Sequence, residues 1–139
     1  MLQSCGYASQ ACFQKVLTEL DGVLYDLKLM DDAQHKRYTG VSNQLILQNF
    51  AVLVESGVPF TVRVPLIPTV TDTEKNLRAL CEFLRHHGVT YAELMPYHAM
   101  TGSKYSLCGR VYAPSFDESI APNPRTELFA AYGIQVKIL

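Results

Sequence analysis

An α/β fold is predicted, in which parallel strands form part of a (β/α) barrel that is incomplete at its N-terminal side. Short apolar runs at 23–25, 60–62 and 91–94 each follow a segment with helical periodicity. This alternation of helix and strand is typical of units that build a parallel sheet. A closed barrel needs about eight such units. Because this chain has fewer, we expect an open wall with two sheet edges.

The helices are predicted from their capping residues and from the glycines that follow them. They begin at Ser9, Asp31-Asp32, Ser42, the capping box 71–74 and Asn123-Pro124. Glycine favours the left-handed conformation at a helix C-terminus, and the last three helices end at Gly57, Gly88 and Gly133. The intervening strands are predicted at 22–28, 60–66 and 90–95, with a half-exposed edge strand at 134–138.

Composition and charge indicate one domain that binds small molecules or proteins. The sequence is 48% hydrophobic and 18% charged, which is enough apolar content for a core. Its 12 basic and 13 acidic residues are spread along the chain, so neither a nucleic-acid footprint nor a basic membrane-surface helix is visible. No apolar stretch approaches the roughly 20 residues that span a bilayer, and the N-terminus lacks the pattern of a signal peptide. We therefore expect a cytoplasmic location.

Neither the cysteines nor the histidines at helix ends predict a metal site. The four cysteines lack the close, repeated spacing of zinc or iron–sulfur ligands. Helical periodicity predicts that Cys12 and Cys81 fill the core as small apolar side chains. His35, His86 and His87 have polar neighbours, so we expect solvated imidazoles. No metal-ligand set is predicted in this chain.

Polar side chains at the ends of successive strands are the candidates for function. Asp26 and Lys28 are two residues apart, so they share one face of a strand. Arg63 ends the next strand and either pairs with Glu93 or reaches a ligand carboxylate as a rigid fork. His98 follows the strand after that. Ligands of parallel α/β folds bind beyond the C-terminal strand ends, so we expect Asp26, Lys28, Arg63 and His98 to share one site.

Residues 96–124 form the longest segment without a clear helical or strand pattern. The segment is rich in Gly, Ser, Tyr and Pro. A loop of this length is uncommon as a plain connector inside a domain and is usually functional. We therefore interpret 96–124 as a lid or a partner surface.

Several motifs, taken in order, resemble the pyruvate formate-lyase activating enzymes. These enzymes are glycyl-radical-enzyme activases of the radical S-adenosylmethionine superfamily. The resemblance covers residues 2–139 and rests on the order and separation of its parts. The matching positions are Asp26-Leu27-Lys28-Leu29-Met30-Asp31, His35, Gly40-Val41-Ser42-Asn43, Val62-Arg63-Val64-Pro65-Leu66-Ile67-Pro68, Asp72, Asn76 and Glu93-Leu94-Met95-Pro96-Tyr97-His98.

The chain also departs from the family pattern. The family's Cys-x-x-x-Cys-x-x-Cys motif, which holds a [4Fe–4S] cluster, does not occur here, nor does its glycine-rich stretch. Gln3 stands where relatives usually have an acidic residue, and Thr69 replaces a glycine. The resemblance therefore implies that residues 1–139 are the C-terminal part of a radical S-adenosylmethionine partial barrel, with a strand cut at 1–3.

The resemblance also implies a reaction, a cofactor and a partner. In activases the cluster reduces S-adenosylmethionine, and the resulting 5′-deoxyadenosyl radical removes hydrogen from a glycine of the partner enzyme. Asp26, Lys28, Arg63 and His98 would form a partial S-adenosylmethionine site, while the cluster ligands would belong to the full-length parent enzyme. The partner would be a glycyl-radical enzyme whose type the sequence does not identify. The chain alone is expected to be inactive.

Two other interpretations remain open on the sequence. One is a non-catalytic module, derived from an activase, that binds the cofactor or the partner. The other is an unrelated β/α enzyme that uses Asp26, Lys28 and His98 for general acid–base chemistry. The unrelated β/α enzyme has no motif in its favour, whereas the activase-derived module shares the activase motifs.

Overall fold

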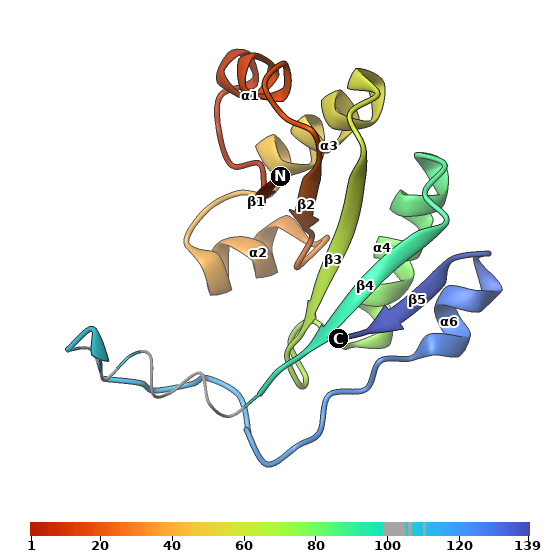
Figure 1. Ribbon diagram of the computed structural model, residues 1–139. Coiled ribbons are helices and arrows are strands. Elements are labelled where there is room, and N and C mark those ends of the chain that lie inside the picture. The colour runs from red at the N-terminus through yellow and green to blue at the C-terminus, as the bar shows by residue number, and fades with distance from the viewer. Residues whose placement is uncertain (99–104, 106, 110) are drawn as a thin grey trace.

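The computed structural model describes residues 1–98, 105, 107–109 and 111–139. Strands and helices alternate along the chain. In order they are β1 (Leu2–Ser4), α1 (Gln10–Leu17), β2 (Val23–Asp26), α2 (Asp32–Thr39), α3 (Gln44–Ser56), β3 (Phe60–Leu66), α4 (Glu74–His86), β4 (Tyr91–Pro96), α6 (Thr126–Ala131) and β5 (Gln135–Ile138). The strands form one parallel sheet in the order β1-β2-β3-β4-β5 (Figure 1).

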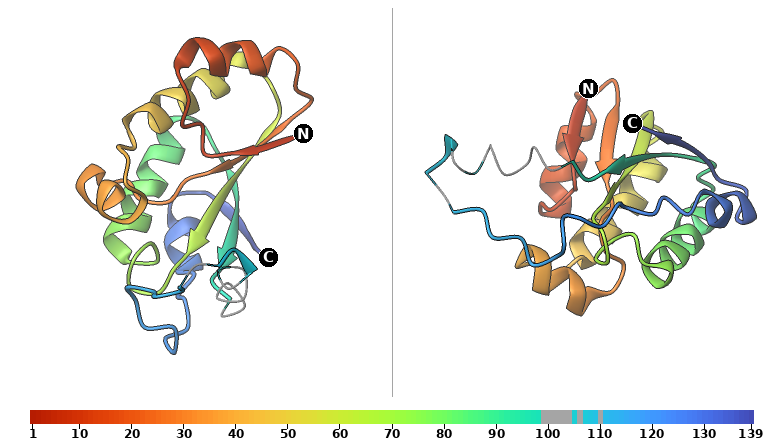
Figure 2. Two further views of the ribbon diagram at one scale, coloured as in Figure 1. Left: turned by 90° about the vertical axis from the view of Figure 1, so that its left-hand side faces the viewer. Right: turned by 90° about the horizontal axis from the view of Figure 1, so that it is seen from below.

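The described helices cover one face of this sheet and leave the other face without a helical layer (Figures 1 and 2). Alternate strand residues point to opposite faces. Tyr25, Val62 and Leu94 are fully buried on the helical side. Their neighbours Asp26, Arg63 and Glu93 are partly exposed on the other side. The fold thus has two layers, with the core between the sheet and the helices.

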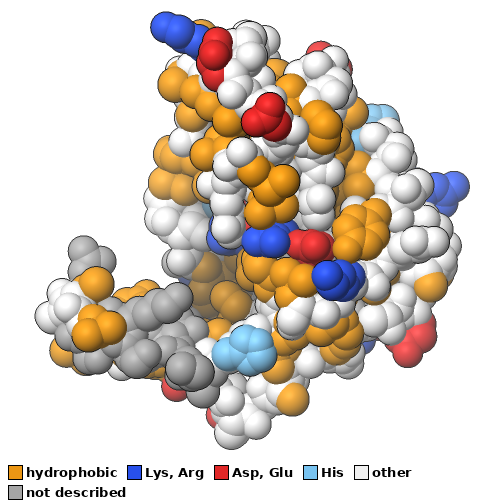
Figure 3. Space-filling view, viewed as in Figure 1, with side chains coloured by type: hydrophobic (Ala, Val, Ile, Leu, Met, Phe, Trp, Pro, Cys, Tyr) orange, Lys and Arg blue, Asp and Glu red, His pale blue; other side chains and the backbone are white. Residues whose placement is uncertain are grey.

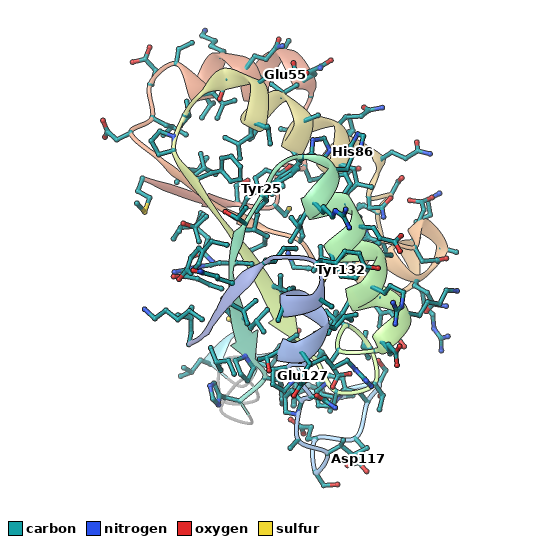
Figure 4. All side chains as sticks on the ribbon, turned by 90° about the vertical axis from the view of Figure 1, so that its right-hand side faces the viewer. Tyr25, Glu55, His86, Asp117, Glu127 and Tyr132 are labelled. Carbon is teal, nitrogen blue, oxygen red and sulfur yellow. The ribbon has the colours of Figure 1, made fainter. Side chains whose placement is uncertain are left out.

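Tyr25 is the central polar group of this core. Its ring lies 5.4 Å from the ring of Phe50 and 6.1 Å from that of Phe13, between centroids. Its hydroxyl donates a 2.7 Å hydrogen bond to the carbonyl of Ile46 on α3. Figure 4 shows Tyr25 between the sheet and the helical layer. Burial raises the pKa of Tyr25, with a smaller contribution from Cys5.

Gly6 allows the chain after β1 to pass directly over Tyr25. Its φ is +69°, and a Cβ at this position would lie 1.9 Å from the Tyr25 hydroxyl oxygen. A residue with a side chain is therefore excluded by contact as well as by backbone conformation. The Asn49 amide fixes the same turn, since it donates to the carbonyls of Gly6 and Ala8.

The predicted fold class is confirmed, because the sheet is parallel and is not closed into a barrel. Strand β3 has the predicted bounds, while β2 and β4 differ by one or two residues. Ser9 and Asp31 are confirmed as N-terminal caps, since their side chains accept hydrogen bonds from the N–H groups of Cys12 and Gln34. The edge strand β5 is also confirmed.

Three predicted helix starts were wrong by one or two residues. The N-cap position of α3 is Asn43, whose side chain makes no capping hydrogen bond. The Ser42 hydroxyl donates to Asp32 and accepts from the N–H of Gln44. Helix α4 is capped by Thr73, because the Thr71 hydroxyl donates to the carbonyl of Pro65. Helix α6 begins at Thr126, after Arg125 in the left-handed conformation. In each case a tertiary hydrogen bond, or the path of the chain, outweighed the local capping signal.

Two predictions about burial were also wrong. Cys12 is exposed, and the buried side chains of α1 are Phe13 and Leu17. His35 is buried, with its Nδ1 2.7 Å from the carbonyl oxygen of Val41. The buried, hydrogen-bonded imidazole of His35 therefore stabilises the chain at the C-terminal end of α2. Cys81 is buried as predicted.

We predict that Tyr25→Phe lowers the free energy of unfolding by about 1 kcal/mol. The substitution keeps the aromatic contacts but removes the buried hydrogen bond to Ile46. Urea unfolding followed by circular dichroism measures the change. Tyr91→Phe is the control, because Tyr91 is exposed and should tolerate the loss of its hydroxyl. An unchanged midpoint for Tyr25→Phe would contradict the prediction.

We also predict a pH-dependent contribution from Asp32. Hydrogen bonds from Lys36 and Ser42 and from the backbone of Asn43 lower the pKa of Asp32 to about 2. Because the pKa of an unfolded Asp is about 3.9, the stabilisation is complete above pH 4 or so and is lost as pH falls through about 2. Asp32→Asn should flatten the stability profile in this window. A carboxyl carbon titration by NMR with a midpoint near 4 would contradict this expectation.

Candidate functional site

Asp26 and Lys28 lie at the C-terminal end of β2, on the face without helices. The Lys28 ammonium is 3.8 Å from Oδ2 of Asp26. The Asp26 side chain is 18% exposed and that of Lys28 is 35% exposed. Oδ1 of Asp26 is buried and accepts no hydrogen bond within the described part of the chain. A buried carboxylate oxygen without a donor can accept a hydrogen bond from a ligand hydroxyl.

Arg63 extends the charged site to β3 and β4. Asp26 and Arg63 are register partners, as are Arg63 and Glu93. The guanidinium donates from Nε to Oε2 of Glu93 over 2.9 Å, and both side chains are mostly buried. This bond uses one of the five N–H donors of a guanidinium. Of the two roles predicted for Arg63, the pairing with Glu93 is therefore present.

The register produces a row of alternating charge across the sheet. Glu93 pairs in register with Lys137 of β5, so the row consists of Asp26, Arg63, Glu93 and Lys137. Figure 3 shows acidic and basic side chains gathered in a band across this face. Alternating charges at strand spacing attract one another and hold the side chains in place. Sequence reasoning missed Lys137, which only the register aligns with the other three.

His98 lies at the same end of the sheet, beyond the last residue of β4. It is exposed and follows Tyr97, whose backbone N–H donates to the carbonyl of Leu66 at the end of β3. The backbone of Tyr97 thus stays beside β3 where the chain leaves the sheet. Asp26 ends β2, Lys28 follows it closely and His98 follows β4, whereas the expectation that Arg63 ends its strand was wrong. Arg63 lies in the middle of β3, in register with Asp26, and Asp26 and Lys28 form the ion pair among the four residues.

The backbone that follows β2 is held by two asparagine side chains. Asn76 of α4 donates to the carbonyl of Lys28 and accepts from the N–H of Met30, both at 2.9 Å. Asn43 donates to the carbonyls of Leu29 and Met30. Sequence reasoning included Asn43 and Asn76 only as matches to a family pattern. Their hydrogen bonds reach across the fold, so no local signal reveals them.

The turn after β3 is hydrogen-bonded to residues 123 and 125, where the long segment meets α6. Thr69 has φ +62°, a conformation in which glycine is favoured. Asp72 stabilises it, because its carboxylate accepts from the N–H of Thr69 at 2.7 Å and from the N–H of Asn123 at 2.9 Å. Arg125 donates to the carbonyl of Asp72. One buried aspartate therefore joins the end of β3 to the start of α6.

A cavity of about 500 Å³ opens beside Lys28. Its walls come from α2, the turn after β3 and the segment around 111–116, and include Tyr38, Thr71 and Phe116. Cavities of this size commonly hold small-molecule ligands. The Tyr97 hydroxyl is hydrogen-bonded to Tyr112 and Glu118, which keeps this part of the long segment near the strand ends. The remaining part of segment 96–124, at 99–104, 106 and 110, lies outside the described residues.

The described residues offer neither a metal-binding cluster nor a membrane-spanning helix. They contain no group of three or more His, Cys, Asp or Glu side chains able to hold a metal ion. No helix in the described ranges is long and apolar enough to cross a membrane.

Comparison with curated proteins identifies similar activating enzymes. The chain is 42% identical over 111 residues to the isethionate sulfite-lyase activating enzyme of Nitratidesulfovibrio vulgaris. The matched region covers 78% of this chain and 36% of that protein. It is 40% identical over 115 residues to the choline trimethylamine-lyase activating enzyme of Oleidesulfovibrio alaskensis, covering 80% and 37%. The chain thus spans little more than a third of the length of these relatives. No family model matches it.

A solved structure agrees with this similarity. A domain of a pyruvate-formate lyase-activating enzyme from Bacteroides vulgatus superposes with a TM-score of 0.74 at 27% identity. The match covers 99% of this chain and 78% of that one. Shared sequence and shared topology therefore point to the same group of proteins. This chain is homologous to the activating enzymes of glycyl-radical enzymes.

Proposed function

We propose that this chain is the C-terminal part of a radical S-adenosylmethionine enzyme that activates a glycyl-radical enzyme. The observation that carries the proposal is the position of Asp26, Lys28 and Arg63. Asp26 and Lys28 lie at the C-terminal end of β2, and Arg63 lies beside Asp26 on the adjacent parallel strand β3, on the face that no described helix covers. Ligands of parallel α/β folds bind at that end. The named activities of the relatives support the same interpretation.

The residues present fit S-adenosylmethionine chemically. The buried Oδ1 of Asp26 is suited to accept from a ribose hydroxyl. Lys28 carries a cation that can bind the methionyl carboxylate, and Arg63 adds a second. His98 is proposed to line the outer end of the same site. When bound with its cluster, this cofactor supplies the radical chemistry, while the protein binds, orients and excludes water.

The described residues do not fit a [4Fe–4S] cluster, because no three of them can hold a metal ion together. Such clusters are held by cysteine thiolates. We therefore assign no step to the cluster in this chain. Under the proposal, its ligands belong to the part of the parent enzyme that corresponds to the unmatched length of the relatives.

We propose that segment 96–124 contacts the partner enzyme or closes over the ligand. Its described residues lie beyond the strand ends and border the cavity beside Lys28. Leu107 and Val111 are 86% and 90% exposed, which is unusual for two large apolar side chains close together in sequence. A glycine-bearing loop of a glycyl-radical enzyme would reach the cofactor past this segment.

We predict weak binding of S-adenosylmethionine that depends on Asp26 and Lys28. Without a metal to chelate the methionyl group, affinity should be millimolar, or about 4 kcal/mol of standard free energy. Asp26→Ala and Lys28→Ala should each abolish measurable binding in a calorimetric or NMR titration. Asp21→Ala and Lys15→Ala remove the same charges from exposed positions and serve as controls.

Each outcome of this titration has a distinct meaning. Binding that survives both site variants would contradict the proposed location of the ligand. Micromolar binding that is lost in both variants would support the location and show that the cluster contributes less to affinity than expected.

We further predict that the chain as given binds no iron–sulfur cluster. The cysteine positions do not supply three close thiolates. Anaerobic reconstitution with iron and sulfide, followed by iron analysis and absorption spectroscopy, tests this. About four irons per chain with a brown chromophore would contradict it.

A further inference from the structure

The hydrogen-bond ladder between β2 and β3 stops just before Lys28, because a proline in β3 lacks the N–H that would continue it. Its last described bond runs from the N–H of Leu27 to the carbonyl of Arg63. The next residue of β3 on the same side of the ladder is Pro65, which has no N–H to donate. The carbonyl of Pro65 accepts from the Thr71 hydroxyl instead. Strand β3 therefore offers few hydrogen bonds to the backbone that follows Leu27.

The side chain of Asn76 supplies the missing support. Its amide donates to the carbonyl of Lys28 and accepts from the N–H of Met30. Bonding to a carbonyl and to the N–H two residues later is what a residue of a neighbouring parallel strand does. The second amide hydrogen donates to the carbonyl of Thr71 at 2.8 Å. One side chain thus uses both donors and its acceptor to replace a strand.

Asn76 is itself held rigidly. It is 8% exposed and lies in the first turn of α4, where its backbone N–H donates to the capping hydroxyl of Thr73. On the other side of the same segment, Asn43 of α3 binds the carbonyls of Leu29 and Met30. Side chains of two helices therefore fix a stretch that would otherwise be an unsupported loop carrying a long, flexible lysine.

We propose that Asn76 is a positioning residue for Lys28: it replaces strand β3 beyond Pro65 and holds the Lys28 backbone so that the ammonium stays beside Asp26. This inference rests on the proposed function for its consequence in ligand binding, but its structural part does not. A lysine with a fixed backbone loses less conformational entropy when it binds a ligand. Asn76 is hydrogen-bonded to the backbone of Lys28, so we infer that its effect on a ligand is exerted through the lysine.

The first test needs no ligand. In Asn76→Asp the side chain keeps its size and its acceptor for Met30, but both donors are lost. A carboxylate in the first turn of a helix is tolerated by the helix dipole, so the variant should fold. Backbone NMR order parameters at Leu29 and Met30 should fall from about 0.85 to below about 0.6. Unchanged order at these positions would overturn the proposal.

Asn49→Asp is the matched control. Asn49 is also a buried helical asparagine that donates to two carbonyls, those of Gly6 and Ala8. Its loss should cost stability and leave the order of Leu29 and Met30 unchanged. In the unaltered protein, the N–H of Met30 should exchange with solvent as slowly as those within β2. Fast exchange there would overturn the proposal even if no variant folds.

The second test separates positioning from a merely structural role. S-adenosylmethionine affinity is measured for the unaltered chain, for Asn76→Asp and for the control Asn49→Asp, at a temperature where all are folded. We expect Asn76→Asp to weaken binding about fivefold and Asn49→Asp to leave it unchanged. Equal losses in the two variants, or no loss in Asn76→Asp, would overturn the positioning role. If the unaltered chain does not bind the cofactor, the proposed function fails, and the order parameters alone decide this inference.

Discussion

The structure depends on the fact that helices cover only one face of its parallel sheet. Along β2, Val23 and Tyr25 are buried against the helices while Asp26 points to the opposite side. A shift of one residue in register would turn Asp26 into the aromatic core around Phe50. Burying an unpaired carboxylate there would cost several kcal/mol. The apolar face therefore fixes the register, and the register places the charges.

The open face carries charges that are partly withdrawn from water. Arg63 and Glu93 are 21% and 14% exposed and bonded to each other, so neither is a lone buried charge. Asp26 is less well satisfied, because Oδ1 is buried and has no donor among the described residues. Partial desolvation strengthens attraction to a charged ligand relative to the same groups in water. A surface with one paired arginine and one carboxylate oxygen that lacks a donor is suited to bind a ligand.

The sequence predicted the strands and their polar ends well, because a strand buried on one face leaves a strong apolar pattern. It predicted helix starts less well, since Ser42 and Asn43, or Thr71 and Thr73, are equally good caps locally. Distant partners decided between them, such as Asp32 for Ser42 and Pro65 for Thr71. The support of Lys28 by Asn76 was beyond sequence reasoning for the same reason: the two residues meet only after β2 and α4 have packed.

The most direct test of the central claim is to map chemical shifts by NMR while S-adenosylmethionine is added. A rival cavity lies between α1 and α3 and is lined by Gln14, Val52 and Glu55. Figure 4 labels Glu55. The account predicts that the largest shifts occur at the backbone amides of Asp26, Lys28 and Arg63, with Gln14 and Glu55 unaffected. The account would be contradicted if the largest shifts occurred at the cavity between α1 and α3 and none occurred at Asp26, Lys28 or Arg63.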